Sequence, residues 1–302
     1  MALIGALVQL EGFVLPELDS SAVVRLRQFV ETNGGLPIER DCQAKVLLNV
    51  GNEDLTETLL PLCRWVIGLT TAITGRVLVG VCGSAGAGKS TLALLLCAAC
   101  NILSEQSQFS QTLSMDAYSF PNTHLSTERA QDHRGHPCTL KDIKGQPKTL
   151  DCASLSRDLE RLRLPSTHTI LLPAYSRQLH DPVPDRVAVS PECRVVIVEG
   201  LHLLHQEGQW KDVFAALHRT IFLDIQRPCC FERVVGRKIA NGRSRESSEA
   251  HFHRVDGPTW DKLQQEKTRA NLVLAVHPTR DRHLNITRIV THSTRDTPPA
   301  VP

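Results

Sequence analysis

The residues most able to do chemistry in this chain lie close together in a glycine-rich stretch. Gly83 and Gly88 are separated by four residues, and Lys89 and Ser90 follow directly. Glycines at this spacing let successive backbone N–H groups point at one anion, because residues with a Cβ avoid the required conformations. Lys89 is then placed to reach the β and γ phosphates of a nucleotide, and the Ser90 hydroxyl to bind Mg²⁺. We expect the nucleotide to contact the whole loop: Gly83, Ser84, Ala85, Gly86, Ala87, Gly88, Lys89, Ser90 and Thr91.

The segments on either side of this loop have the character that such a motif requires. Residues 77–81 form an apolar, valine-rich run that is typical of a buried strand, and the apolar run from Leu92 onward is typical of a helix. A helix that begins at the loop directs its positive dipole end toward the same anion. Strand, glycine turn and helix together predict a nucleotide-binding P-loop rather than a turn without function.

Two carboxylates follow other predicted strands. Asp116 ends a short strand that begins near Gln111, and Glu199 follows the apolar run 195–198. Ligands of open α/β sheets bind at the carboxyl ends of strands, so Asp116 is placed to meet the γ-phosphate and an acceptor hydroxyl. Glu199 could hold Mg²⁺ through water or polarise the attacking group. We expect Ser90, Asp116 and Glu199 to surround the metal, with a turn or N-cap residue as the alternative for Asp116.

Basic and polar residues later in the chain could complete a site. Arg233 and Arg237 are four residues apart in a helix-like stretch, which places both guanidinium groups on one face. They could close over a phosphate as a lid, and a solvated basic face is the alternative. Polar loops at 118–150 and 174–182 follow predicted strands, and we expect them to form the acceptor pocket. The candidate substrate residues in these loops are Tyr118, Asn122, Tyr175 and Arg177.

Composition limits the possible partners. The chain has 34 Lys and Arg residues and 32 Asp and Glu residues. This near balance of charge argues against a nucleic-acid partner and favours a small anion bound at a local site. No apolar run reaches the roughly 20 residues that a membrane span needs, and the first ten residues lack the basic start of a signal peptide. Ten cysteines scattered through apolar stretches favour a reducing compartment, so we expect a cytoplasmic protein. The sequence does not determine the oligomeric state, and a homodimer is one possibility.

Two groups of residues have spacings found in metal sites. Cys97 and Cys100 are separated by two residues, but they lie in the helix predicted after the glycine loop, so we expect a core-facing pair. His133, His136 and Cys138 are the better candidate, with a histidine-rich loop as the alternative.

The remaining patterns define the organisation of the chain. Residues 1–55 are predicted to be a helical extension, with one capped helix from Asp19 to the glycines at 34–35 and a second helix over 39–49. Residues 56–290 are predicted to form an α/β domain with the three-layer P-loop NTPase fold and a mainly parallel sheet. Residues 291–302 are expected to be a flexible tail.

Four further segments give a more specific resemblance. They are Met115-Asp-Ala-Tyr-Ser-Phe-Pro-Asn122, Lys144-Gly-Gln-Pro-Lys-Thr-Leu-Asp151, the segment 173–182 and Ile197-Val-Glu-Gly-Leu-His-Leu-Leu204. In order and spacing the chain resembles, over residues 56–290, the phosphoribulokinase, uridine kinase and pantothenate kinase superfamily of P-loop kinases.

This resemblance implies roles for individual residues. It implies that Asp116 is the base or orienter of the acceptor hydroxyl and that Glu199 lies near the metal. It also implies that Tyr175 and Arg177 face the substrate, while Arg233 and Arg237 belong to a lid.

Departures from the superfamily pattern bear on the acceptor. Ala117 replaces a usual glycine, and Arg177 stands where pantothenate kinases have histidine. The pattern around Arg177 is closer to a bacterial and fungal branch of sugar or nucleoside kinase-like proteins.

We therefore predict an ATP- and Mg²⁺-dependent kinase that transfers the γ-phosphate to a hydroxyl of a sugar, nucleoside or pantothenate-like metabolite. A P-loop ATPase without an acceptor and a nucleotide-binding scaffold without catalysis are the alternatives. The sequence contains no Asn-Lys-x-Asp motif, which argues against a GTPase, and no Leu-Ser-Gly-Gly-Gln motif, which argues against a transporter ATPase.

Overall fold

The computed structural model describes residues 17–40, 44–276 and 286–291. The first ten residues and almost all of the predicted tail lie outside this part of the chain. Within it, no helix is both long and apolar enough to cross a bilayer.

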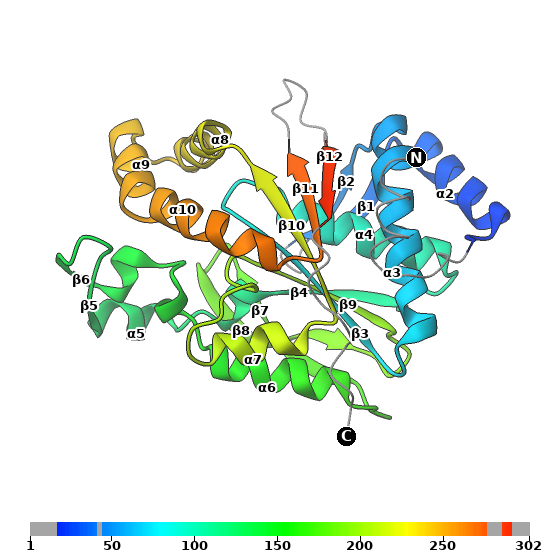
Figure 1. The fold of residues 1–302 in the computed structure, drawn as a ribbon, viewed down its shortest axis with the longest axis horizontal. Coiled ribbons are helices and arrows are strands. Elements are labelled where there is room, and N and C mark those ends of the chain that lie inside the picture. The colour runs from blue at the N-terminus through cyan, green and yellow to red at the C-terminus, as the bar shows by residue number, and fades with distance from the viewer. Residues whose placement is uncertain (1–16, 41–43, 277–285, 292–302) are drawn as a thin grey trace.

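A six-stranded sheet forms the centre of the molecule (Figure 1). Its spatial order is β12–β11–β10–β3–β9–β4. Its parallel strands are β4 (Ser110–Ser114), β9 (Val195–Gly200), β3 (Val77–Gly83), β10 (Arg219–Ile225) and β11 (Leu272–Val276). The last strand, β12 (Ile286–Thr291), runs antiparallel to β11. The predicted α/β class and the mainly parallel sheet are confirmed, whereas β11 was not predicted.

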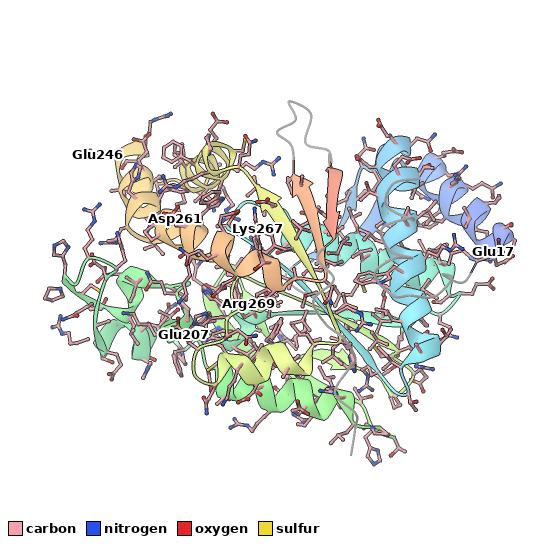
Figure 2. The ribbon with its side chains drawn as sticks, viewed as in Figure 1. Glu17, Glu207, Glu246, Asp261, Lys267 and Arg269 are labelled. Carbon is pink, nitrogen blue, oxygen red and sulfur yellow. The ribbon has the colours of Figure 1, made fainter. Side chains whose placement is uncertain are left out.

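A helical arm connects β10 to β11. It comprises α8 (Arg227–Ala240), α9 (Arg245–His251), a π-helical turn at Phe252–Asp256 and α10 (Gly257–Glu266). The residues after α10, among them Lys267 and Arg269 labelled in Figure 2, bind the sheet and its loops. Lys267 Nζ lies 2.9 Å from Asp224 Oδ2, and Arg269 Nη1 donates to the Leu204 carbonyl at 3.1 Å. The arm is therefore fastened to the carboxyl end of β10, the edge at which ligands of such sheets bind.

Helices cover both faces of the sheet. The helices α3 (Leu60–Ala72) and α4 (Lys89–Leu103) cover one face, and α2 (Ser20–Asn33) packs on α4. On the other face lie α6 (Cys152–Arg163) and α7 (Trp210–Ala216). This arrangement is the predicted three-layer fold.

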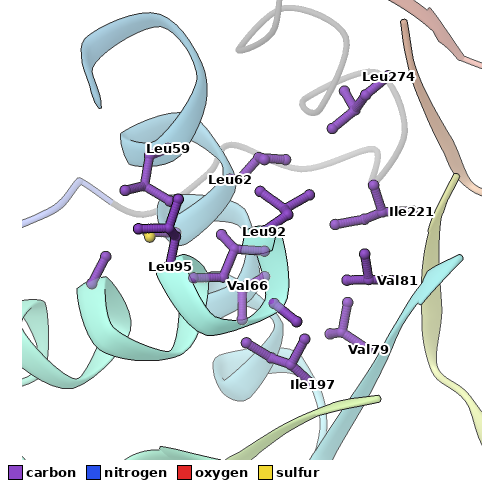
Figure 3. Close-up of a cluster of buried hydrophobic side chains, with 14 of the residues drawn as sticks. Leu59, Leu62, Val66, Val79, Val81, Leu92, Leu95, Ile197, Ile221 and Leu274 are labelled. Carbon is purple, nitrogen blue, oxygen red and sulfur yellow. The ribbon is translucent and has the colours of Figure 1, made fainter. Parts of the chain in front are cut away.

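Side chains of the central strands point alternately to the two faces of the sheet and so contribute to both hydrophobic cores. Every residue of β3 is buried; Val79 and Val81 belong to the α3–α4 core, and Leu78 belongs to the α6–α7 core. Figure 3 shows these two valines with Ile197, Ile221 and Leu274 of neighbouring strands, opposite leucines of α3 and α4. A strand buried on both faces reads as a continuous apolar run, which is why the sequence could locate it.

The N-terminal extension is only partly helical. The helix α2 begins at its cap Asp19, which accepts N–H bonds from the first turn, and ends at Gly34 with φ 72°. The second predicted helix, over 39–49, is wrong, because β1 (Leu36–Arg40) and β2 (Ala44–Leu48) form an antiparallel hairpin there. Leu36 and Ile38 are buried in the α3–α4 core, so period-two packing overrides local helix propensity.

The two segments expected to be polar loops are also more ordered than predicted. Residues 124–150 contain most of α5 (Asn122–Thr127), the short strands β5 (Arg129–Gln131) and β6 (Pro137–Thr139), and two 3₁₀ turns. Leu125, Leu140 and Ile143 form a small apolar cluster with Val255 of the arm. Residues 174–182 belong to a hairpin of β7 (Ile170–Ser176) and β8 (Asp181–Val189). These short helices, turns and strands need few apolar residues. Their segments are therefore polar overall, which is why the sequence predicted loops there.

Candidate active site

The glycine loop connects β3 to α4 in a conformation that residues with a Cβ rarely adopt. Gly86 has φ 76° and Gly88 has φ 97°, and the Ala87 N–H donates to the Ser84 carbonyl at 3.2 Å. Gly88 is the N-cap of α4, and among the described residues no side chain caps this helix. The first N–H groups of a helix have no partner within it. An anion in the loop would satisfy them, so the loop fits the predicted triphosphate.

Lys89 lies where its charge meets both predicted acids. Its ammonium donates to the Ser84 carbonyl at 3.0 Å. Loss of solvent lowers the pKa of Lys89, and the nearby carboxylates of Glu199 and Asp116 oppose that shift. The lysine, the loop and the two acids therefore form one electrostatic group.

Ser114 connects the two acids. Ser114 of β4 is the register partner of Glu199 on the adjacent strand β9. The Ser114 hydroxyl donates to Glu199 Oε1 at 2.5 Å and accepts the Asp116 N–H at 3.3 Å. This places an exposed carboxylate, Asp116, beside the buried carboxylate of Glu199 at the carboxyl edge of the sheet.

The state of Glu199 depends on its surroundings. Burial raises its pKa, and the negative charge of Asp116 raises it further. Lys89 and hydrogen bonds from the Ser114 and Ser90 hydroxyls oppose this rise and favour the carboxylate. Because the Ser90 hydroxyl touches the Glu199 carboxylate, these two groups could share a cation at the end of the loop. Hard oxygen donors of this kind suit Mg²⁺.

The helix α8 packs directly on the glycine loop. Arg233 Nη1 donates to the Gly86 carbonyl at 3.2 Å, and the Cys230 thiol contacts the Ala85 carbonyl at 3.1 Å. A Cβ added at Gly86 would lie 3.2 Å from that of Arg233. The charge of Arg237 acts on Lys89 and lowers its pKa. Of the two arginines predicted as a lid, Arg233 contacts the loop directly, and Arg237 lies close enough to Lys89 for its charge to act on it.

The candidate substrate residues divide into two groups. Tyr118 is 4% exposed, and its hydroxyl donates to Asp158 of α6 at 2.9 Å. Burial raises the pKa of Tyr118, and the charge of Asp158 and the hydrogen bond to it raise that pKa further. Tyr118 belongs to the core, because the 3₁₀ turn Met115–Tyr118 directs it inward, and the prediction that it binds substrate is not supported. Asn122 and Tyr175 instead lie together at a rim that also contains Lys144.

Tyr175 lies near Asp116 and beside Lys144. Burial raises its pKa to about 12, and the charges of Asp116 and Asp181 add to the rise. Arg177 opposes it, and the Lys144 ammonium lies 5.3 Å from the ring centroid. These residues form one group that lies close enough to Asp116 for its negative charge to act on both Tyr175 and Lys144.

Several residues of this site were not singled out from the sequence. Ser114, Lys144, Asp181 and His202 acquire their positions from pairings over long sequence separations. Lys144, Asp181 and His202 lie within the segments that carried the family resemblance, and that was their one available signal. Ser114 is a common residue at a strand end, and nothing local indicates its partner Glu199.

The other metal candidates find no support. Within the described ranges, no group of three or more His, Cys, Asp or Glu side chains lies together as a metal site. His136 pairs with Asp132 in the turn between β5 and β6. Cys100 is buried in the α3–α4 core, as predicted, and the Cys97 thiol contacts the Ser110 carbonyl at 3.3 Å.

Fold and site together define a P-loop nucleotide-binding protein. The model of the family described as Phosphoribulokinase / Uridine kinase matches residues 78–283. The chain belongs to this family and is a P-loop kinase.

Similar proteins agree with this assignment. The Escherichia coli K12 protein YggC is 31% identical over 234 residues, which cover 76% of this chain and 91% of YggC. A Silicibacter structure described as a fructose transport system kinase is 28% identical with a TM-score of 0.59, covering 69% of this chain and 95% of that one. YFH7 of Saccharomyces cerevisiae shares the fold, with 19% identity, a TM-score of 0.57 and coverage of 68% and 95%.

Proposed function

We propose that the protein transfers the γ-phosphate of ATP to a hydroxyl group of a small metabolite, with Mg²⁺ as the metal. The observation that best supports this proposal is the pair of hydrogen bonds made by the Ser114 hydroxyl, one to the Glu199 carboxylate and one from the Asp116 N–H, which keeps the two acidic residues close together. A site for nucleotide hydrolysis alone would not require an exposed carboxylate close to a second group of polar residues around Tyr175 and Lys144.

On the nucleotide side, the backbone N–H groups of the loop and the N-terminus of α4 would hold the phosphates. Lys89, Arg233 and Arg237 bring positive charge to the same place. Ser90 and Glu199 would hold Mg²⁺, which supplies further positive charge to the phosphate oxygens. Such fixed charges stabilise the transferring group without reorganisation during the reaction.

On the acceptor side, Asp116 would orient the hydroxyl and accept its proton. A bond forms between the acceptor oxygen and the γ-phosphorus, the bond from that phosphorus to the leaving ADP oxygen breaks, and the hydroxyl proton passes to the carboxylate. Asn122, Tyr175 and Arg177 would bind the remainder of the acceptor. Holding both reactants in line is the main contribution of such a site.

A sugar is the first acceptor class to test. The Silicibacter relative is described as a fructose transport system kinase, and it is 28% identical to this chain. The polar group near Asp116 combines the cations Lys144 and Arg177 with the anion Asp181 and the hydroxyl of Tyr175. Mixed charges and hydroxyl partners suit a neutral acceptor with several hydroxyl groups.

A screen with labelled ATP tests this function. The full chain is incubated with Mg²⁺ and ATP labelled at the γ-phosphate, together with D-fructose, D-ribose, uridine or pantothenate in separate reactions. We expect one acceptor to yield a labelled product in equal amount to ADP, and the Lys89→Ala variant to lose most of this product. Release of inorganic phosphate regardless of acceptor would instead identify an ATPase.

A further inference from the structure

Three chain segments are hydrogen-bonded to one another at the rim that contains Asn122, Tyr175 and Lys144. They are the start of α5 at Asn122, the turn at Lys144–Gly145 and the turn of the β7–β8 hairpin at His180–Asp181. These segments are separated by more than twenty residues in sequence, and the charge of Asp116 acts on Lys144 and on the neighbouring Tyr175. The shape of the proposed acceptor site therefore depends on what holds these segments together.

Lys144 contacts the other two segments at once. Its ammonium donates to Asn122 Oδ1 at 2.9 Å and to the His180 carbonyl at 2.8 Å. The same ammonium lies 5.3 Å from the centroid of the Tyr175 ring, within the range of a cation–π contact. A lysine that directs two N–H bonds at protein oxygens is fixed in place.

Asn122 and the hairpin turn are bonded to each other as well. The Asn122 N–H donates to Asp181 Oδ1 at 2.8 Å, and Asn122 Nδ2 donates to the His180 carbonyl at 2.9 Å. His180 has φ 53°, a left-handed conformation that non-glycine residues adopt at a cost of order 1 kcal/mol. Such a conformation persists where surrounding bonds determine it.

The turn that carries Lys144 is anchored from the core. His202 is 2% exposed, and its Nε2 lies 2.7 Å from the Gly145 carbonyl. Because a carbonyl oxygen only accepts, Nε2 must carry the hydrogen. The His202 ring packs edge-on against Trp210, with 5.7 Å between centroids. His202 follows Glu199 by three residues, so the turn is tied to the strand that carries the buried acid.

We propose that Lys144 is a positioning residue for the acceptor, holding α5 and the β7–β8 turn in one arrangement opposite Asp116, with His202 as its anchor. This inference rests on the proposed function. Lys144 acts through Asn122 and Tyr175, so its removal loosens acceptor binding and leaves the glycine loop unchanged.

Hydrogen exchange and steady-state kinetics of the full chain test this role. The Lys144→Met variant keeps the aliphatic stem and loses the donors, and Lys141→Met is the matched control, because Lys141 is exposed on the same turn. In Lys144→Met we expect amide exchange at residues 122–127 and 176–182 to accelerate by ~10-fold. The acceptor KM, measured with D-fructose or whichever screened compound is phosphorylated, should rise ~10-fold with kcat changed less than ~3-fold.

Nucleotide affinity and the control variant complete the test. Binding of a fluorescent ATP analogue should match that of the unmodified protein in both variants, and Lys144→Arg should restore most of the acceptor KM. Unchanged exchange in both segments would overturn the proposal, as would faster exchange with an unchanged acceptor KM. If no compound in the screen is phosphorylated, the proposed function fails, while the exchange comparison still decides whether Lys144 holds the rim.

Discussion

Replacing Gly200 by alanine is the sharpest way to move the two acids apart. Gly200 follows Glu199 at the end of β9. A Cβ at this position would lie 2.6 Å from the Met115 Cβ and 2.8 Å from the Met115 Sδ. The sulfur can rotate away, but the Met115 Cβ is fixed to the backbone next to Asp116. Either β9 or the turn that carries Asp116 must therefore shift.

The size of the shift follows from the contact distance. Ordinary contact for a Cβ begins at 3.4 Å, so the distance of 2.6 Å must increase by about 0.8 Å. The same movement stretches the 2.5 Å bond between Ser114 and Glu199. Misplacement by 1 Å costs up to ~100-fold in turnover. Overpacking a core position costs ~1–3 kcal/mol of unfolding free energy.

The assay compares turnover, nucleotide affinity and stability. For Gly200→Ala we expect kcat to fall between ~10-fold and ~100-fold while the dissociation constant of an ATP analogue changes less than ~3-fold. Gly236→Ala is the control, because no described atom lies within 4 Å of the added Cβ, and in the helix α8 it should stabilise by ~0.5–1 kcal/mol. Turnover of Gly200→Ala at the unmodified level would refute the claim that the spacing of the acids controls transfer.

Three other variants or conditions test separate parts of the account. Lys89→Ala should lose most phosphoryl transfer and keep its far-UV circular dichroism; unaltered transfer would contradict a phosphate role. His205 bonds the buried Glu266 at 2.7 Å, so His205→Ala should lower the unfolding free energy in urea by ~3–5 kcal/mol, and a loss below ~1 kcal/mol would contradict this pairing. Burial lowers the pKa of His202 from 6.5 to about 4, so the unfolded chain binds the proton first as pH falls. The free energy of unfolding should decrease from pH 6.5 toward pH 4, and this histidine should account for ~2 kcal/mol of the loss at pH 5. In urea titrations at pH 6.5 and pH 5, the His202→Gln variant should lack this contribution of ~2 kcal/mol.

Local signals in the sequence were sufficient for the centre of the fold. The strand at 77–81, the glycine loop and the helix after it each carry a pattern set by neighbouring residues, and the structure has all three. The apolar run before Glu199 likewise predicted β9, because a central parallel strand is buried on both faces. Placing acids at strand ends then followed from the general position of ligands in such sheets.

What the sequence did not reveal depends on pairing between distant segments. The Ser114–Glu199 bond joins residues 85 apart, and it forms because β4 and β9 are neighbours. The hairpin β1–β2 replaced a predicted helix because Leu36 and Ile38 find a core that local propensity cannot represent. Tyr118 was predicted to face substrate, but its 3₁₀ turn directs it toward Asp158.

The Asp116→Asn variant tests the central claim most directly, because it keeps the shape of the side chain and removes its charge. Phosphorylation of the acceptor and affinity for an ATP analogue are measured on the same preparation. If Asp116 aligns and deprotonates the hydroxyl, transfer falls at least ~100-fold while nucleotide affinity stays within ~3-fold. Equal losses in transfer and nucleotide affinity would place Asp116 on the nucleotide side and contradict the account.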